Sequence, residues 1–265
     1  MVESSKPTVV ITGISGYLGS HVALVFLKDG SYNVRGTVRD TKNPVKIEPL
    51  RKAFGTYFDQ LTLVEANLND RESIFAAIKG ADFVVHTASP APLAPPKHED
   101  ELIIPAVDGT KAVMEASYAN KVKRVVITSS VAAIIECRPE DRPKDGKFSE
   151  QNWSNPESEH IDAYSKSKVL AEMAAWNYQK SLPEDSRMEL VTINPGLILG
   201  PAFVGAGFNT GDLITNIMQG KYPGVPKIMI PLVGVVEVAD AHLQALRRPA
   251  AANKRFVLVN STVWF

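Results

Sequence analysis

A tyrosine and a lysine four residues apart, Tyr164 and Lys168, form the first pair of side chains that could act together. Residues 161–180 have a helical pattern, and positions four apart on a helix share one face. An ammonium group beside a phenol stabilises the phenolate, which makes the tyrosine a usable proton donor near neutral pH. The spacing also arises by chance, but no other tyrosine of the chain is followed by a lysine four residues later. We therefore interpret Tyr164 as a candidate general acid tuned by Lys168.

Hydroxyl side chains close the apolar run at 124–128, where Thr128 is followed by Ser129 and Ser130. The carboxyl ends of strands in open α/β sheets face the ligand crevice, so these hydroxyls are expected to point into a site. Ser130 can then donate a hydrogen bond to a carbonyl oxygen as that oxygen becomes an alkoxide. Serine and threonine at a strand end also cap turns, and the residues alone leave both interpretations open.

Three glycines at three-residue spacing, Gly13, Gly16 and Gly19, separate a β-branched run at 8–12 from an apolar helical pattern. This order predicts a strand, a tight turn and a helix whose free N–H groups face a phosphate. Gly13 permits the turn, Gly16 lets the backbone approach a pyrophosphate, and Gly19 allows close packing of the helix. The usual spacing is G-x-G-x-x-G, so a glycine-rich turn without a ligand is the alternative.

A basic residue, Arg39, follows the predicted strand at 32–38, about twenty residues after the last of these glycines. At this position of a dinucleotide fold an acidic residue binds a ribose 2′-OH, whereas an arginine accommodates a 2′-phosphate. The planar guanidinium can bind phosphate through two hydrogen bonds, and Lys46 adds a second positive charge. Asp40 argues against a phosphate, and a merely exposed arginine is the alternative. We favour NADP(H) as the cofactor.

Strand-like and helix-like segments alternate along most of the chain. Strands are predicted at 8–12, 32–38, 61–66, 83–86, 124–128, 190–193 and 256–259, and helices after Gly19, near 47–54, after Asp70, and at 102–118, 161–180, 212–218 and 235–246. This alternation predicts an α/β fold, a Rossmann-type doubly wound parallel sheet with helices on both faces. We assign 1–195 to an NADP-binding Rossmann domain. The mixed segment 196–265 is expected to contribute a small substrate lobe and the late elements of the Rossmann core.

The composition excludes several classes of partner. The 29 basic and 29 acidic residues cancel, which gives no electrostatic basis for binding nucleic acid or an anionic membrane. No apolar run approaches the ~20 residues of a membrane span, and the N-terminus lacks the layout of a signal peptide. The only cysteine, Cys137, excludes an internal disulfide, so we expect a reducing compartment, the cytoplasm. The five histidines have no metal-ligand spacing, and no metal is expected.

The motifs occur together in an order that resembles one family. They are TGISGYLG at 12–19, VRD at 38–40, HTASP at 86–90, VVITSS at 125–130, YSKSK at 164–168 with AE at 171–172, NPG at 194–196 and VADAH at 238–242. Over nearly its whole length the chain resembles the extended short-chain dehydrogenase/reductase superfamily. Within it, the chain looks most like the group of dihydroflavonol 4-reductases, cinnamoyl-CoA reductases and yeast methylglyoxal/carbonyl reductases.

The resemblance implies an NADPH-dependent reductase of a ketone or aldehyde, a small-molecule carbonyl substrate. Ser130, Tyr164 and Lys168 are then the catalytic triad: Ser130 orients the carbonyl, Tyr164 protonates its oxygen, and Lys168 holds the nicotinamide ribose. The cofactor-binding residues expected from motifs and resemblance together are Gly13, Ser15, Gly16, Tyr17, Leu18, Gly19, Arg39, Lys46, Asn67, Leu68, Thr87, Ala88, Ser89, Thr128, Tyr164, Lys168, Pro195, Leu197 and Ile198. Asn67 stands where the family has aspartate, and its carbonyl oxygen can meet the adenine amino group.

The chain departs from the family at two places, which bear on its substrate and on its length. Plant dihydroflavonol reductases have an asparagine where this chain has Ile135, so a more apolar ketone or aldehyde is favoured over a flavonoid. Relatives also continue beyond the position of Phe265, and we expect a truncated chain or short isoform with an open substrate pocket. A nucleotide-sugar epimerase or dehydratase using NAD, and a dinucleotide-binding sensor or scaffold, are the alternative functions. The long helices at 102–118 and 161–180 could pair across a two-fold axis, so the chain is expected to be a monomer or homodimer.

Overall fold

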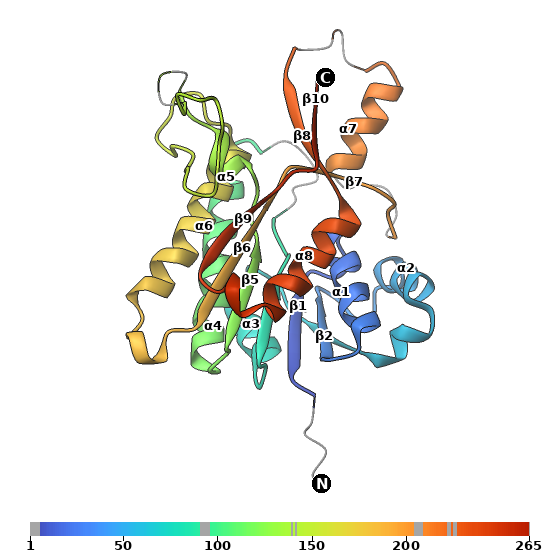
Figure 1. Ribbon diagram of the computed structural model, residues 1–265. Helices are drawn as coiled ribbons and strands as arrows, with labels where there is room; N and C mark the ends of the chain where they lie inside the picture. The colour runs from blue at the N-terminus through green and yellow to red at the C-terminus, as the bar shows by residue number, and fades with distance from the viewer. Residues whose placement is uncertain are drawn as a thin grey trace.

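A seven-stranded sheet forms the centre of the computed structural model, which describes residues 6–90, 96–138, 140, 142–203, 209–221, 224 and 227–264 (Figure 1). Its strand order is β3-β2-β1-β4-β5-β6-β9, and every neighbouring pair is parallel. The strands are β1 (Thr8–Thr12), β2 (Asn33–Val38), β3 (Leu61–Glu65), β4 (Phe83–His86), β5 (Arg124–Thr128), β6 (Glu189–Pro195) and β9 (Lys254–Leu258). This confirms the predicted Rossmann-type sheet, whose order reverses direction between β1 and β4.

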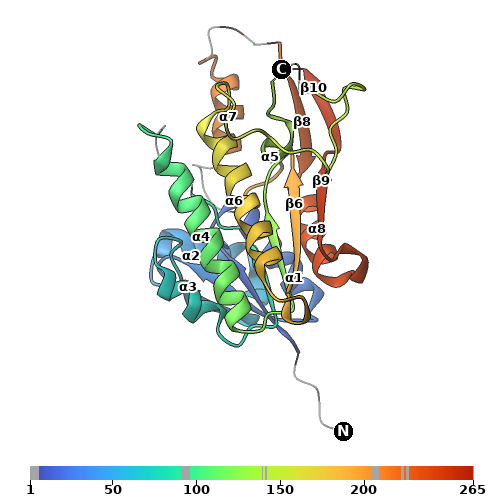
Figure 2. The same cartoon turned by 90° about the vertical axis from the view of Figure 1, so that its left-hand side faces the viewer.

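Helices cover both faces of this sheet (Figures 1 and 2). One layer contains α1 (Tyr17–Asp29), α2 (Pro44–Phe54) and α8 (Val235–Arg247), and the other contains α3 (Arg71–Ile78), α4 (Asp100–Ala119) and α6 (Ala163–Ser181). Successive side chains of β1 point to opposite faces, so Val9 and Ile11 join the first core and Val10 joins the second. Short helices η1 (Gly55–Gln60), α5 (Ala132–Ile135), η3 (Glu184–Ser186) and η4 (Pro249–Ala251) complete the layers.

A second, three-stranded sheet lies beyond the carboxyl ends of the main strands, beside α7 (Asn209–Met218) (Figure 1). Its central strand β8 (Met229–Gly234) runs parallel to β7 (Leu197–Leu199) and antiparallel to β10 (Ser261–Trp264). None of these three strands was predicted from the sequence. β7 has only three residues, β8 contains Pro231, and the residues of β10 are exposed, so none has the buried β-branched run that marks a central strand.

Side-chain caps set the beginnings of several helices. Asp70 accepts hydrogen bonds from the N–H groups of Glu72 and Ser73 and so begins α3, as predicted. The second helix begins earlier than the expected position 47, because Asn43 caps it and Pro44 occupies its first turn.

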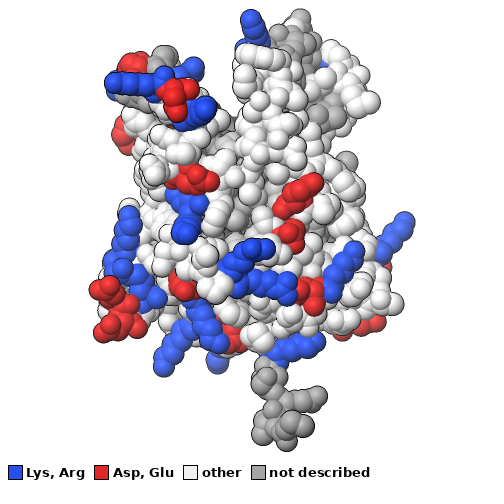
Figure 3. All heavy atoms as spheres, viewed as in Figure 1, with Lys and Arg blue, Asp and Glu red and all other residues white. Residues whose placement is uncertain are grey.

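Acidic and basic side chains are intermixed over the face of the molecule seen in Figure 3, as the balanced charge indicates. In the part of the chain that the structure describes, no helix has the length and apolar character needed to cross a membrane.

Candidate active site

The glycine loop after β1 requires a glycine at its first position. Gly13 has a φ of +72°, and a Cβ added there would lie 2.9 Å from the Cα of Ala88. Thr37 of β2 fixes the loop from the other side, since its Oγ1 accepts from the Gly13 N–H at 3.0 Å and its carbonyl accepts from the Ile14 N–H at 3.1 Å. The loop is therefore wedged between the ends of β2 and β4.

The first turn of α1 presents backbone rather than side chains. Gly16 is its exposed N-cap residue and provides no side-chain cap. Gly19 is buried: an added Cβ would overlap the Gly13 carbonyl oxygen and lie 2.8 Å from Thr87 Oγ1. Ser15 and Leu18 are half-buried at the same turn. Open N–H groups at a helix N-terminus attract phosphate, so this end of α1 fits a pyrophosphate.

Tyr17, at the start of α1, directs its side chain toward the segment after β7. Its hydroxyl donates to the Gly200 carbonyl at 3.0 Å, and burial raises the pKa of this phenol to about 12. A ligand at the helix N-terminus would therefore meet the backbone of Tyr17, whereas the hydroxyl is committed to Gly200.

The loop after β4 is fastened to the end of β1. Thr87 Oγ1 donates to the Thr12 carbonyl at 2.5 Å, and the Ala88 N–H donates to Thr12 Oγ1 at 3.1 Å. The Thr12 hydroxyl in turn lies 2.8 Å from Nδ1 of the buried His86. Thr87 and Ala88, both predicted along the cofactor, are thus held beside the glycine loop.

A second buried histidine fixes the threonine that ends β5. His242 Nδ1 lies 2.7 Å from the Val238 carbonyl, which can only accept, so Nδ1 carries the hydrogen. Its Nε2 then accepts from the Thr128 hydroxyl at 2.7 Å. The hydroxyl of Thr128, predicted to contact the cofactor, is therefore directed to His242 of α8.

Because His86 and His242 are buried, we expect the protein to lose stability on acidification. Burial, and for His86 also the charge of Lys168, lowers the pKa of each imidazole from 6.5 to about 4. The unfolded chain therefore binds more protons below pH 6.5, and stability falls as the pH drops from 6.5 toward 4. Each histidine should lower the free energy of unfolding by about 2 kcal/mol between pH 7 and 5, measured by urea denaturation.

The loss is assigned by comparing variants at both pH values. His242→Gln should lose less stability than the parent protein between pH 7 and 5. The exposed His160 provides the matched control, and His160→Gln should follow the parent. An unchanged pH dependence in His242→Gln would contradict the prediction.

The loop after β2 leaves its basic residues open. Arg39 and Lys46 are exposed, and within the described ranges the Arg39 guanidinium has no hydrogen bond or ion pair. Asp40, whose negative charge argues against a bound phosphate, accepts a hydrogen bond from the Lys42 N–H with one carboxylate oxygen at 2.8 Å. The loop is anchored by Glu65, which accepts from both the N–H and the hydroxyl of Thr41.

The turn after β3 contains Asn67 and Leu68. The Asn67 side-chain oxygen accepts from the Asn69 N–H at 3.1 Å, so the group expected to face adenine already has one local partner. Leu68 is half-buried and packs toward Gly109 of α4.

Tyr164 and Lys168 lie on the first turns of α6, where Asp162 caps the helix. The Asp162 carboxylate accepts from the Tyr164 N–H at 2.8 Å and from the Ser165 N–H at 3.0 Å. Lys168 Nζ lies 5.6 Å from the centre of the Tyr164 ring, which confirms that the two residues share one face. Tyr164 is 45% exposed, and in the described part of the chain its hydroxyl has no hydrogen-bond partner.

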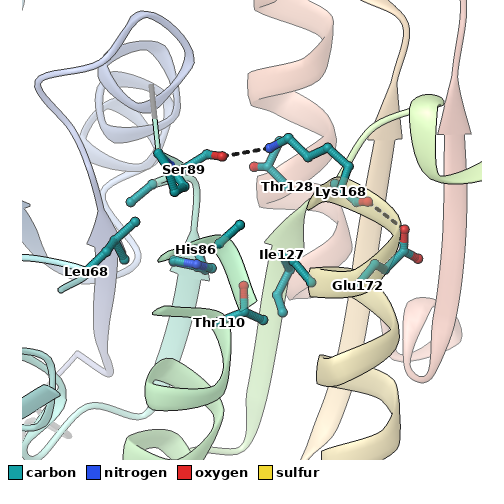
Figure 4. Close-up of a pocket in the computed structure, with 13 residues that line it drawn as sticks. Leu68, His86, Ser89, Thr110, Ile127, Thr128, Lys168 and Glu172 are labelled. Atoms are coloured by element: carbon teal, nitrogen blue, oxygen red, sulfur yellow. Dashed lines mark hydrogen bonds between the residues drawn. The ribbon is translucent and has the colours of Figure 1, made fainter. Parts of the chain in front are cut away.

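Lys168 joins this helix to the loop after β4. Its Nζ donates to Ser89 Oγ at 2.9 Å, above a small cavity lined by His86, Thr110 and Ile127 (Figure 4). The lysine–tyrosine pair is thereby held at the same edge of the sheet as the glycine loop. Across the described ranges, no three His, Cys, Asp or Glu side chains gather as a metal site would require.

Ser130 is buried directly after β5. Its Oγ accepts from the Ala132 N–H at 3.1 Å, which leaves the hydroxyl hydrogen available to another acceptor. The neighbouring Ser129 Oγ donates to Glu172 of α6 at 2.5 Å. The end of β5 is thus bonded to the helix that carries Tyr164 and Lys168.

Three predicted residues at the end of β6 and in β7 follow the same edge. Pro195 is buried at the end of β6, and its carbonyl accepts from the Val131 N–H at 3.0 Å. Leu197 and Ile198 are half-buried in β7. No role was predicted for Glu172 or Asn194, although Glu172 follows Lys168 by four residues and therefore shares its helix face.

Comparison with known protein families gives one match over most of the chain. The family described as NAD dependent epimerase/dehydratase matches residues 9–259. Cinnamoyl-CoA reductase 1 from Arabidopsis thaliana is 34% identical over 256 residues, which are 96% of this chain and 70% of that protein. Dihydroflavonol 4-reductase from Zea mays is 33% identical over 260 residues, covering 95% of this chain and 70% of that protein.

Solved structures share the same fold. Yeast methylglyoxal/isovaleraldehyde reductase Gre2 complexed with NADPH superposes with a TM-score of 0.83 at 27% identity, covering 97% of this chain and 79% of that one. The NADPH complex of Gre2 from Candida albicans gives a TM-score of 0.81 at 29% identity, over 97% of this chain and 79% of the other.

Proposed function

This chain belongs to the NAD dependent epimerase/dehydratase family, the extended short-chain dehydrogenases/reductases, and we propose that it reduces a ketone or aldehyde with NADPH. The observation that carries the proposal is the position of Lys168, which lies beside the Tyr164 ring and donates to Ser89. One ammonium group thus joins the candidate proton donor to the loop beside the glycine turn. Relatives named as reductases, among them cinnamoyl-CoA and dihydroflavonol reductases, support the direction of the reaction.

The chain's own groups fit a dinucleotide phosphate at two places. The open first turn of α1, with Gly16 at its N-cap, suits the pyrophosphate. The Arg39 guanidinium, which has no ion pair with any residue that the structure describes, suits a 2′-phosphate, and the comparison with two reductases solved with NADPH supports this choice. Ser89 and Lys168 would hold the nicotinamide ribose, while Pro195 and Ile198 would lie beside the nicotinamide.

The bound cofactor would supply the hydride, and this chain's residues would manage the charge that develops on the carbonyl oxygen. Ser130 would donate its free hydroxyl hydrogen to that oxygen, since its Oγ already accepts from the Ala132 N–H. Tyr164 would transfer its phenolic proton to the same oxygen. Lys168 would stabilise the resulting phenolate through its positive charge.

The substrate we favour is apolar around its carbonyl group. Ile135, half-buried in α5, follows Ser130 by five residues and provides no side-chain hydrogen bond. Between the two upper lobes in Figure 3 the visible surface is mainly uncharged, whereas the lobe at the upper left carries both acidic and basic side chains. Segments 91–96 and 203–222 are also expected to line the pocket, and of these, 91–95, 204–208 and 222 lie outside the described residues.

Initial rates with a panel of aldehydes and ketones, each with NADPH and with NADH, test the function. Turnover with NADPH and an apolar carbonyl supports the proposal. Tightly bound NAD in the purified protein, without a preference for NADPH, would favour an epimerase or dehydratase. NADPH binding without any reduction would favour a sensor.

The 2′-phosphate contact makes a separate prediction. Arg39→Ala should weaken NADPH binding about 10- to 100-fold and leave NADH binding unchanged, because a charge-assisted pair with phosphate contributes roughly 1.5–3 kcal/mol. Fluorescence titration with each nucleotide measures both constants. Lys28→Ala, which removes an equal charge from the last turn of α1, is the control and should change neither. If the ratio of the NADPH and NADH dissociation constants is unchanged in Arg39→Ala, Arg39 does not bind the 2′-phosphate.

A further inference from the structure

A buried carboxylate links the candidate catalytic helix to three strands. Glu172, 2% exposed, accepts hydrogen bonds from five described residues. They are Ser129 at 2.5 Å, Asn194 at 2.7 Å, Thr192 at 3.0 Å, Trp176 at 3.3 Å and Arg255, whose Nε lies at 2.6 Å. Every partner is a donor, which only an acceptor at position 172 can satisfy.

Asn194 connects this carboxylate to Ser130. Its Nδ2 donates both to Glu172 Oε2 at 2.7 Å and to the Ser130 carbonyl oxygen at 3.1 Å. Its own Oδ1 is fully buried and accepts from no group in the described part of the chain. A buried oxygen without a donor destabilises a fold, so the hydrogen bonds of this amide do not merely maximise stability.

Backbone hydrogen bonds place Ser130 where the side-chain amide of Asn194 can hold its carbonyl group. The Ser129 N–H donates to the Ile193 carbonyl at 2.7 Å and the Val131 N–H to the Pro195 carbonyl at 3.0 Å. Ser130 lies between these two contacts with β6, and the side chain of Asn194 holds its carbonyl. The peptide that follows Ser130 is therefore fixed from the neighbouring strand.

Arg255 of β9 extends the same network to the segment beside α5. Its Nη1 donates to the carbonyls of Glu150 and Asn152 at 2.7 and 2.6 Å, and its guanidinium lies 3.7 Å from the centre of the Trp153 ring. Ser154, next in the chain, donates to the Ala132 carbonyl at 2.6 Å. Ala132, two residues after Ser130, is thus held by the segment that Arg255 braces.

We propose that Asn194, aimed by Glu172, is a positioning residue that sets the orientation of Ser130 toward the carbonyl oxygen. Arg255 holds Glu172, Glu172 fixes the amide of Asn194, and the amide fixes the Ser130 carbonyl, so that the serine hydroxyl keeps its direction. The inference rests on the proposed function, because it requires Ser130 to act on the substrate.

A double-mutant cycle tests it. Ser130→Ala should lower kcat on the order of 10²-fold, as removal of an oxyanion donor does. Asn194→Leu, which keeps the volume and removes both hydrogen bonds, should lower kcat on the order of 10-fold while NADPH binding is retained. If the amide acts through the serine, the double variant should match Ser130→Ala alone, because interacting residues are non-additive.

Thr192→Val is the matched control, since it also removes one buried hydrogen bond to Glu172, while among the described residues Thr192 forms no side-chain hydrogen bond with Ser130. Its kcat should stay near that of the parent protein. Thermal midpoints of all variants, with Asn194→Ala as a second substitution, separate loss of folding from loss of activity.

The outcomes test the positioning role of Asn194 separately from the role of Ser130 in the proposed function. Additive losses in the double variant, or an equal loss in Thr192→Val, would make the network purely structural and overturn the inference alone. No loss in Ser130→Ala would contradict the serine's role in the proposed function and remove the inference with it.

Discussion

Tyr164→Phe is expected to reduce kcat on the order of 10³-fold, because general acid catalysis by a positioned side chain contributes about 10²- to 10⁴-fold. The substitution removes only the hydroxyl, which has no partner among the described residues, so the fold should be unaffected. NADPH binding should be retained, since Lys168 and the glycine loop are unchanged. Steady-state reduction of an active carbonyl and fluorescence titration with NADPH measure the two quantities.

The control for this variant lies on the same helix. Tyr178→Phe removes a hydroxyl near the other end of α6, and burial already raises the pKa of that phenol. Its kcat should match that of the parent protein. Full turnover in Tyr164→Phe would exclude the proposed proton donor, whereas a joint loss of turnover and NADPH binding would indicate damage to the cofactor site.

Lys168→Met is expected to lower kcat on the order of 10²-fold and also to weaken NADPH binding. The methionine keeps much of the volume but removes the ammonium that stabilises the phenolate. It also removes the hydrogen bond to Ser89, which joins α6 to the loop after β4. The combined effect distinguishes this variant from Tyr164→Phe, in which only kcat should fall.

Lys166→Met is the matched control, two residues away on the same helix. Lys166 Nζ forms an ion pair with Glu99 at 2.9 Å, and an exposed pair of this kind contributes little to stability. Removing its charge should leave kcat and NADPH binding close to the parent values. If both lysine variants lose kcat and NADPH binding equally, the losses result from the lower positive charge of the helix and not from the position of Lys168.

The regular part of the fold could be predicted from local patterns. Buried runs such as Phe83–His86 and Arg124–Thr128 appear in the structure with the predicted bounds, because a parallel strand covered on both faces is continuously apolar. The strands β7, β8 and β10 could not, since their pairing joins Ser261 to Leu232 and Leu197 to the same residue. Such short, partly exposed strands are defined by their partners and hardly by their own sequence.

Some features of the candidate site could likewise be predicted from the sequence, and others could not. The spacing of Tyr164 and Lys168 fixed their common helix face, and the glycine spacing marked a turn whose first position needs a positive φ. The directions of Tyr17 and Thr128 could not be predicted, because their hydroxyls bind Gly200 and His242, residues distant along the chain.

The type of fold, the family and the pair Tyr164 and Lys168 could be predicted from the sequence, since each depends on periodicity or on short motifs. Only the folded structure reveals that Lys168 reaches Ser89, and that Glu172 gathers donors from β6, from β9 and from the serine that follows β5. The physical reason is that a buried charge must collect its partners from whatever elements surround it. Those elements become neighbours only when the sheet has formed, so no pattern within one segment contains them.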